Sequence, residues 1–263
     1  MIAAKELDSL VLRYENEDFI KDDPVQFVYR GKTKKDKEIA GFIASSFAFG
    51  NRKAFIKTLS QIFECCDYDM YNYIKNGDFC ALKGSYYRIY KDVDIIGLFK
   101  VLHYIYTKEG GLEEVFRANF KEDRGMKYDH FLSGIVDLMY KYSPKDVSFG
   151  FYHMIPNAKK GSAMKKMNMF LRWMVRKSPV DIGIWDFMAP KDLFIPLDVH
   201  VARQSRKMGL LTRKSNDYTA AKELTENLRS FCFEDPIKYD FAMFAFGVEL
   251  SKESRSLINV QRC

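Results

Sequence analysis

Residues 154–175, MIPNAKKGSAMKKMNMFLRWMV, combine a turn signal with a helical pattern of apolar residues. The residues PNAKKG suit a turn, and apolar residues then recur at the spacing of an α-helix. The recurring apolar positions are Ala163, Met167, Phe170, Leu171 and Met174. Lys165 lies roughly 200° around the helix axis from the first of these positions. We therefore expect its side chain to point away from the apolar face, near the start of the helix.

In the rest of the chain, apolar residues recur mainly at the spacing of an α-helix. Only residues 85–90 suggest the two-residue alternation of a strand. Further helical segments are expected at residues 7–14, 39–47, 55–63, 95–106, 113–120, 128–140, 199–207, 218–230 and 239–246. The longest irregular connection is residues 178–196, and a loop of this length in a compact domain is often functional. The pattern predicts an all-α protein.

Composition narrows the class of protein. The 263 residues are 47% hydrophobic with a net charge of +7, which favours a polyanionic partner but also fits an ordinary basic surface. Five cysteines without a C-x-x-C pair and four histidines without an H-E-x-x-H pattern predict a reduced protein with no metal and no cofactor. No apolar leader or bilayer-spanning run is visible, so we expect a cytoplasmic, nucleoid-associated protein that does not bind membranes.

A second informative segment is FIPLDVHVARQSRKMGLL, residues 194–211. Asp198 stands where a helix to about Lys207 begins, and Gly209 is placed to end it. Asp is an excellent helix N-cap, and capping alone explains this residue. A carboxylate held rigidly after an Ile-Pro-Leu run also suits electrostatic or proton-transfer chemistry, so two interpretations stay open.

The first segment has two interpretations as well. Lys159, Lys160, Lys165 and Lys166 surround the turn at residues 156–161. Exposed amides at a helix start bind phosphate, and the lysines add positive charge. The alternative is a solvated basic turn before an ordinary core helix.

Both segments resemble motifs of the helix-hairpin-helix DNA glycosylases. Gly161-Ser162-Ala163-Met164-Lys165 resembles the G-x-G-x-K hairpin of endonuclease III and eukaryotic 8-oxoguanine DNA glycosylase, with Ala163 replacing the second glycine. Asn168 matches the Asn or Asp that follows in those proteins. Residues 196–200, Pro-Leu-Asp-Val-His, resemble the later P-x-D-x-H motif. The chain is also similar to an uncharacterised bacterial family with K-G-S-A-x-K and I-P-L-D-V-H.

This resemblance implies an architecture of two helical domains flanking a cleft, with a helix-hairpin-helix element that binds DNA. We expect residues 36–177 to form the first domain, and residues 1–35 with 178–263 to form the second, which carries Asp198. The Lys-to-Asp separation is longer than in endonuclease III, and archaeal 8-oxoguanine glycosylases share this feature. The cysteine cluster of endonuclease III is missing here.

The resemblance also implies roles for individual residues. Lys165 would be the nucleophile and Asp198 its carboxylate partner, or Lys166 the nucleophile if the alignment shifts by one. The implied DNA-binding residues are Lys160, Gly161, Ser162, Ala163, Lys166, Asn51, Arg52, His200 and Trp185. Of these, Asn51 and Arg52 occupy the place of the residue that family members wedge into the duplex. Trp185 and His200 are candidates for the base pocket, although a core role is common for such residues.

The resulting expectation is a monomeric base-excision repair enzyme that acts on double-stranded DNA with a damaged base. It would remove an oxidised purine such as 8-oxoguanine through a lysine Schiff base, with associated lyase activity. A lysine attacks only as a neutral amine, and its ordinary pKa is about 10.4, so the site must favour the neutral form. The alternatives are a monofunctional, water-activating glycosylase, a non-catalytic helix-hairpin-helix nucleic-acid-binding protein, and a helical protein scaffold.

Overall fold

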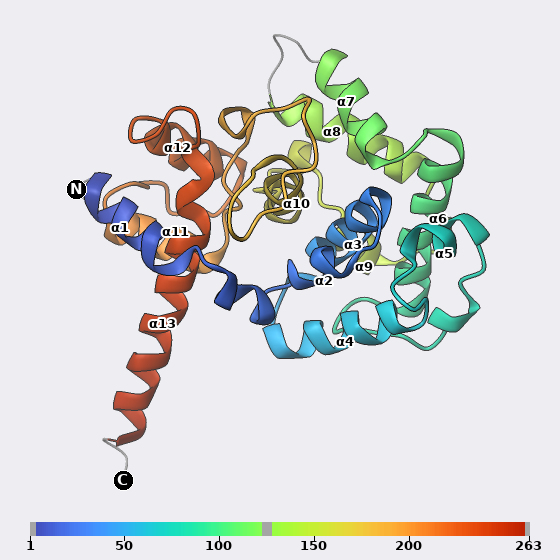
Figure 1. Ribbon diagram of the computed structural model, residues 1–263, viewed down its shortest axis with the longest axis horizontal. Helices are drawn as coiled ribbons and strands as arrows, with labels where there is room; N and C mark the ends of the chain where they lie inside the picture. The colour runs from blue at the N-terminus through green and yellow to red at the C-terminus, as the bar shows by residue number, and fades with distance from the viewer. Residues whose placement is uncertain (1–3, 123–127, 261–263) are drawn as a thin grey trace. The chain divides into compact units, whose positions relative to one another are not determined.

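The computed structural model describes residues 4–122 and 128–260, and every regular element in these ranges is a helix (Figure 1). The predicted all-α class is confirmed. The alternation at residues 85–90 gives only an isolated bridge between Tyr87 and Tyr90. Within the described ranges, no helix has both the length and the apolar character needed to cross a membrane.

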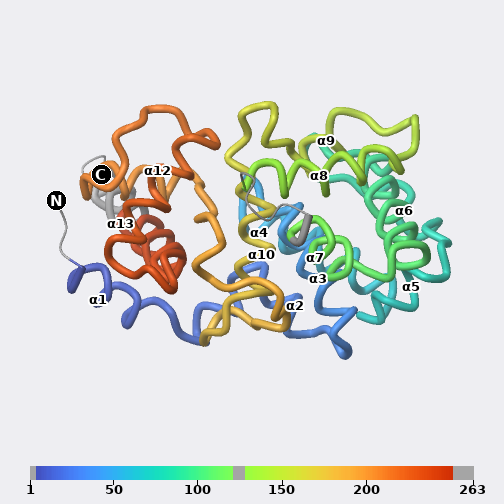
Figure 2. The backbone as a smooth tube through the Cα atoms, turned by 90° about the horizontal axis from the view of Figure 1, so that it is seen from above, coloured from blue at the N-terminus to red at the C-terminus, as the bar shows by residue number. Residues whose placement is uncertain are grey.

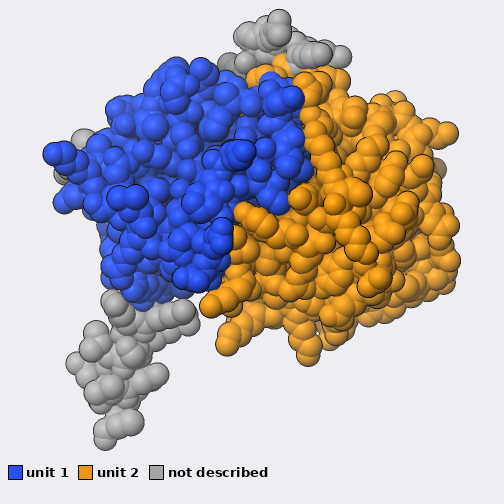
Figure 3. Space-filling model, viewed as in Figure 1, with its two compact units in different colours: residues 1–19, 163–263 blue, residues 20–162 orange. Residues whose placement is uncertain are grey.

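The chain divides into two compact units, which Figure 3 distinguishes by colour: unit 1 comprises residues 1–19 and 163–263, and unit 2 comprises residues 20–162. These boundaries differ from the expected 36–177. The helix that begins at Lys165 belongs to unit 1, where its Arg172 and the residue that follows the helix, Arg176, pair with carboxylates of that unit. Lys165 and Asp198 therefore lie in the same unit.

Unit 2 holds most of the helices before residue 163. They are α2 (Gln26–Arg30), α3 (Lys34–Phe47), α4 (Arg52–Glu64), α5 (Met70–Asn76), α6 (Asp92–Lys108), α7 (Leu112–Glu122), α8 (Tyr128–Lys141) and α9 (Phe149–Met154), with the 3-10 turns η2 (Cys80–Leu82) and η3 (Ala158–Lys160). Helix α3 is buried from Glu38 to Phe47 and packs against α2 and α5. It is the central helix of this unit.

The start of α3 shows why this helix forms where it does. The backbone N–H of Asp36 donates to the Thr33 hydroxyl at 3.1 Å, and the Thr33 N–H donates to the Asp36 carboxylate at 2.9 Å. This reciprocal capping satisfies two N–H groups of the first turn. The other Asp36 oxygen accepts from the Tyr71 N–H at 2.9 Å, which fixes α5 against α3.

Unit 1 consists of α1 (Ala4–Tyr14), α10 (Lys165–Val175), α11 (Val199–Lys207), α12 (Tyr218–Arg229) and α13 (Tyr239–Val260), with the 3-10 turns η4 (Pro190–Asp192) and η5 (Pro236–Lys238), while η1 (Glu17–Asp22) crosses the boundary. Both α1 and α11 pack against α13; α1 lies beside it in Figure 2. Tyr14 meets Ala242 and Ala245 in this contact. The stretch from 176 to 198 contains only η4, which confirms the predicted irregular connection.

Candidate active site

Asp198 is the N-cap of α11, as its sequence context predicts. Its Oδ1 accepts hydrogen bonds from the backbone N–H groups of His200 and Val201, both at 2.8 Å. Its Oδ2 accepts no hydrogen bond from any described residue, and the side chain is half-buried. One oxygen therefore fixes the carboxylate in place while the other is left open, so the capping and chemical interpretations are compatible.

Lys165 and Lys166 are the first two residues of α10, but their surroundings differ. Lys165 is half-buried, whereas Lys166 is only 8% exposed. Burial, and next the positive charge of Lys165, lower the pKa of Lys166 well below its ordinary value. Residues 166–175 are all buried, and Lys165, which was expected to point away from the apolar face, is the residue of α10 that keeps partial exposure.

A third titratable group connects the two candidate residues. Asp240 is the second residue of α13 and is buried. Burial raises the pKa of its carboxyl to about 7, against the lowering effect of Arg172; the charge of Asp198 raises it further and that of Lys165 lowers it. Lys165 and Asp198 thus act on one and the same buried carboxyl. All three residues lie at helix N-termini, where the backbone favours negative charge.

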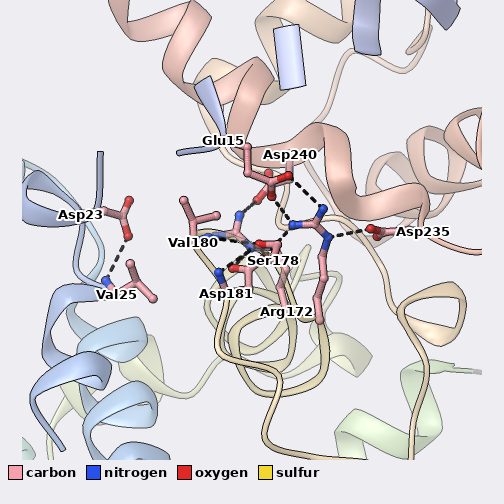
Figure 4. Close-up of polar contacts among 10 residues, drawn as sticks. Glu15, Asp23, Val25, Arg172, Ser178, Val180, Asp181, Asp235 and Asp240 are labelled. Carbon is pink, nitrogen blue, oxygen red and sulfur yellow. Dashed lines mark hydrogen bonds and ion pairs between the residues drawn. The ribbon is translucent and has the colours of Figure 1, made fainter. Parts of the chain in front are cut away.

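Asp240 is one end of a buried ionic network in unit 1 (Figure 4). The Arg172 Nη1 donates to Asp240, and its Nε donates to Asp181 Oδ1 at 3.0 Å. Arg172 follows Lys165 by seven residues, so both lie near the same side of α10. The network therefore fixes the helix that carries Lys165 to the helix that carries Asp240.

The network continues one turn along α10. Arg176 donates to Asp181 Oδ2 at 2.9 Å, to Asp235 at 2.7 Å and to Glu15. These acceptors come from the irregular connection, from the residue before η5, and from the segment after α1. Such buried charges are tolerated because each one is paired, and removing one partner leaves an uncompensated charge.

The connection between α9 and α10 departs from the expected hairpin. Gly161 has a φ of +80°, as a hairpin glycine would, but Ala163 does not adopt a left-handed backbone. Met164 does so instead, with a φ of +54°, which is uncommon for a residue with a side chain. The side-chain amide of Asn168 donates to the Ala163 carbonyl at 3.2 Å, which ties the connection to the first turn of α10.

The lysines before α10 are not equivalent. Lys159 pairs with Asp137 at 2.7 Å on the surface of unit 2. Lys160 is exposed, and no ion pair to a described residue is observed for it. Ser162 is half-buried. Lys160 is therefore the lysine of this turn whose charge is left for a partner.

The two base-pocket candidates lie in different surroundings. Trp185 is 3% exposed and packs edge-on against Phe170, with ring centroids 5.2 Å apart, so the structure places it in the core of unit 1. His200 is half-buried and lies edge-on to Phe244, with centroids 5.7 Å apart. Its Nδ1 is buried and makes no hydrogen bond with a described residue.

The two wedge candidates lie in unit 2, at the start of α4. Asn51 is exposed and caps this helix, because its side chain accepts from the Ala54 N–H at 3.0 Å. Arg52 is half-buried, and its Nη1 donates to the Asp22 carbonyl at 3.3 Å. Both belong to unit 2, whereas Lys165 and Asp198 belong to unit 1.

Sequence reasoning missed Arg172 and Asp181. The available signal was a pair of arginines four residues apart, Arg172 and Arg176, around the apolar run Trp-Met-Val, because buried arginines need carboxylate partners. Tertiary structure decides which carboxylates pair with these arginines. Within residues 4–122 and 128–260, no group of three or more His, Cys, Asp or Glu side chains is arranged to hold a metal ion.

The protein is all-α, and the charges of Lys165 and Asp198 both act on the buried carboxyl of Asp240. One oxygen of Asp198 caps a helix and the other accepts no hydrogen bond from a described residue. A family model described as a protein of unknown function (DUF2400) matches residues 23–249, and the chain belongs to this family. The match includes Lys165, Asp198 and Asp240. No curated protein and no solved structure matches the chain.

Proposed function

We propose that the protein is a DNA glycosylase with associated abasic-site lyase activity, in which Lys165 is the nucleophile and Asp198 the carboxylate partner. One observation carries the proposal: Asp198 keeps Oδ2 open while Oδ1 is fixed by the cap, and its charge acts together with that of Lys165 on Asp240. Simple capping explains Oδ1 only. A positioned lysine and carboxylate are the groups that this reaction requires.

The reaction begins with a nucleotide turned out of the duplex, at a cost of a few kcal/mol. The neutral amine of Lys165 attacks C1′ of the sugar, the bond from C1′ to the base breaks, and the base leaves with the electron pair and takes up a proton. Asp198 stabilises the positive charge that develops on the sugar. Ring opening then gives a Schiff base, and loss of a C2′ proton expels the 3′ phosphate, which breaks the strand.

Exposure favours Lys165 over Lys166 as the nucleophile. A nucleophile must reach C1′, and the Lys166 side chain is enclosed whereas that of Lys165 is only half-buried. Lys166 contributes in another way. Burial, and next the positive charge of Lys165, lower the pKa of the Lys166 amine well below its ordinary value, so the start of α10 does not need to hold two positive charges side by side.

Borohydride trapping tests this proposal. The protein is mixed with duplex DNA that contains 8-oxoguanine or an abasic site, and borohydride reduces any Schiff base to a stable covalent complex. We expect trapping with the wild type and with Lys222→Ala, a matched change of an exposed lysine on α12. We expect none with Lys165→Ala. Trapping that survives in Lys165→Ala and disappears in Lys166→Met would assign the nucleophile to Lys166.

The open oxygen of Asp198 also favours a second candidate, a monofunctional glycosylase in which Asp198 activates water. Such an enzyme releases the base without a covalent intermediate, so base release without trapping identifies it. An absence of both base release and trapping across a panel of lesions would contradict both enzymatic proposals, and salt-dependent DNA affinity would then indicate a non-catalytic nucleic-acid-binding protein.

A further inference from the structure

Unit 2 exposes a group of large apolar side chains that its core does not use. Tyr86 is 75% exposed and Phe149 is 70% exposed, and Ile89 and Tyr152 are exposed as well. They come from two segments, residues 86–90 and 149–153, and a third segment, residues 49–53, lies against both. We call these three segments the aromatic surface. Large exposed apolar groups that gather in one place mark interaction sites.

Close contacts bring the three segments together. The Arg88 guanidinium lies over the Phe49 ring, 4.9 Å from its centroid, and the Phe49 ring meets that of His153 at 4.7 Å. A Cβ atom on Gly50 would lie 2.8 Å from Arg88 Nη1, and one on Gly150 would lie 2.6 Å from the Ile89 carbonyl oxygen. Glycine is needed at Gly150 because the close atom belongs to the backbone, and at Gly50 because its φ is +82°.

The tip of residues 87–90 is held in a costly conformation. Tyr87 and Tyr90 exchange backbone hydrogen bonds at 2.9 and 2.8 Å, which closes a tight turn with Arg88 and Ile89 at its tip. Arg88 has a φ of +55°, at the position where such turns usually have glycine. The buried rings of Tyr87 and Tyr90 fix the turn, and an arginine side chain is displayed at its tip.

Phe149 is held just as firmly. The preceding residue, Ser148, caps α9, and its N–H and hydroxyl both donate to the buried Asp94 carboxylate, at 2.6 and 2.7 Å. The Phe149 ring lies 6.0 Å from the His153 ring, and His153 in turn bonds the Tyr90 hydroxyl through Nδ1 at 2.9 Å. The ring is therefore displayed from a fixed backbone, which lowers the entropy lost when a partner binds.

The charges of the aromatic surface select the chemistry of its partner. Residues 49–53, 86–90 and 149–153 contain Arg52, Lys53 and Arg88, and no Asp or Glu. Aromatic rings interleaved with cations are what a single-stranded nucleic acid requires, because its bases stack on rings and its phosphates pair with basic groups. A polyanion with exposed bases matches both the rings and the cations of this surface.

We propose that the aromatic surface binds unpaired DNA, with a nucleobase stacked on Phe149 and the adjacent phosphate at Arg88. The choice of DNA rests on the proposed function, since a repair enzyme meets unpaired bases wherever it opens a duplex. The surface is distinct from Lys165 and Asp198, which belong to the other unit.

The test measures affinity for a single-stranded oligonucleotide and for a duplex with an unpaired bubble, using 2-aminopurine fluorescence as the stacking signal. Phe149→Ala should weaken binding about ten-fold, which is within the effect of losing one stacked base, and should abolish quenching of the 2-aminopurine. Phe233→Ala, which removes a 62% exposed ring from unit 1, is the matched control and should change neither.

Arg88→Gly separates binding from folding. Because glycine adopts the φ of this turn without strain, this variant should keep or raise the melting temperature while its DNA affinity falls. Wild-type affinity in Phe149→Ala, or an equal loss in Phe233→Ala, would overturn the proposal. Failure of the glycosylase proposal looks different: trapping and base release are absent while DNA binding still depends on Phe149. If trapping depends on Lys165 but DNA affinity does not change in Phe149→Ala, only the proposal for the aromatic surface is contradicted.

Discussion

At the scale of single residues, the two carboxylate oxygens of Asp198 separate stability from chemistry. Asn keeps an oxygen for the cap but carries no charge, whereas Ala removes the cap as well. We expect Asp198→Asn to unfold like the wild type in urea and to lose base-release activity. Asp198→Ala should lose the same activity and about 1 kcal/mol of unfolding free energy.

The measurements are urea unfolding and base release on lesion-containing duplex. Full activity in a folded Asp198→Asn would show that the residue is only a cap. An equal loss of unfolding free energy in Asp198→Asn and Asp198→Ala would contradict the assignment of Oδ1 to the helix cap and Oδ2 to the reaction.

At the level of the secondary-structure elements, the bond between Arg172 of α10 and Asp240 of α13 makes stability depend on the protonation of the Asp240 carboxyl. Because burial raises the pKa of Asp240 to about 7, the native state holds this proton between pH about 4 and 7, where the unfolded chain has released it. The contribution of Asp240 to stability therefore falls as pH rises through this window. Comparison with Asp240→Asn should reveal this fall as a difference of a few kcal/mol, since each pKa unit corresponds to about 1.4 kcal/mol.

Urea unfolding of the wild type, Asp240→Asn and a control variant from pH 3 to 8 checks this sign. Asp217→Asn is the control, because a hydrogen bond from Arg213 lowers the pKa of Asp217 and Asn still caps α12. The difference in unfolding free energy between the wild type and Asp217→Asn should change only below about pH 4, where the contribution of Asp217 rises with pH. A wild-type curve parallel to that of Asp240→Asn from pH 4 to 7 would contradict the raised pKa.

The elements also show which structural features the sequence could predict. Helical periodicity located α3, α6 and α11 because each presents a regular apolar pattern, and Asp198 and Gly209 marked the ends of α11. Short helices such as α2 and α9 escaped detection because five or six residues do not establish a period.

The candidate site was predictable where chemistry is local in the sequence and unpredictable where it is not. Lys165 and Asp198 stand at helix starts that turn and cap signals mark. The partners of Arg172 were hidden because Asp181 and Asp240 become its neighbours only through tertiary packing. Burial of Lys166 had the same cause: α10 is covered on every side, which no period within one helix reveals.

At the scale of the whole molecule, the net charge of +7 predicts DNA affinity that falls steeply with salt. Lys160→Gln should reduce the slope of log affinity against log salt concentration by about 1, because one phosphate contact is lost. Lys159→Gln is the matched control. Its effect should be smaller because the Lys159 amine already pairs with Asp137. Affinity titrations on undamaged duplex from low to high salt measure both slopes. Equal slopes for the wild type and Lys160→Gln would exclude Lys160 as a phosphate ligand.

Unit 1 is assembled from segments that precede and follow unit 2 in the sequence, and this has a consequence for synthesis on the ribosome. Helix α1 is translated before unit 2, but its packing partner α13 and the Arg176 that bonds Glu15 are translated after unit 2. Unit 2 can thus fold during elongation, while the apolar side of α1 stays exposed until α13 is synthesised. Asp240, the buried carboxyl on which the charges of Lys165 and Asp198 act, lies in α13, so a chain stalled before α13 lacks this member of the candidate site.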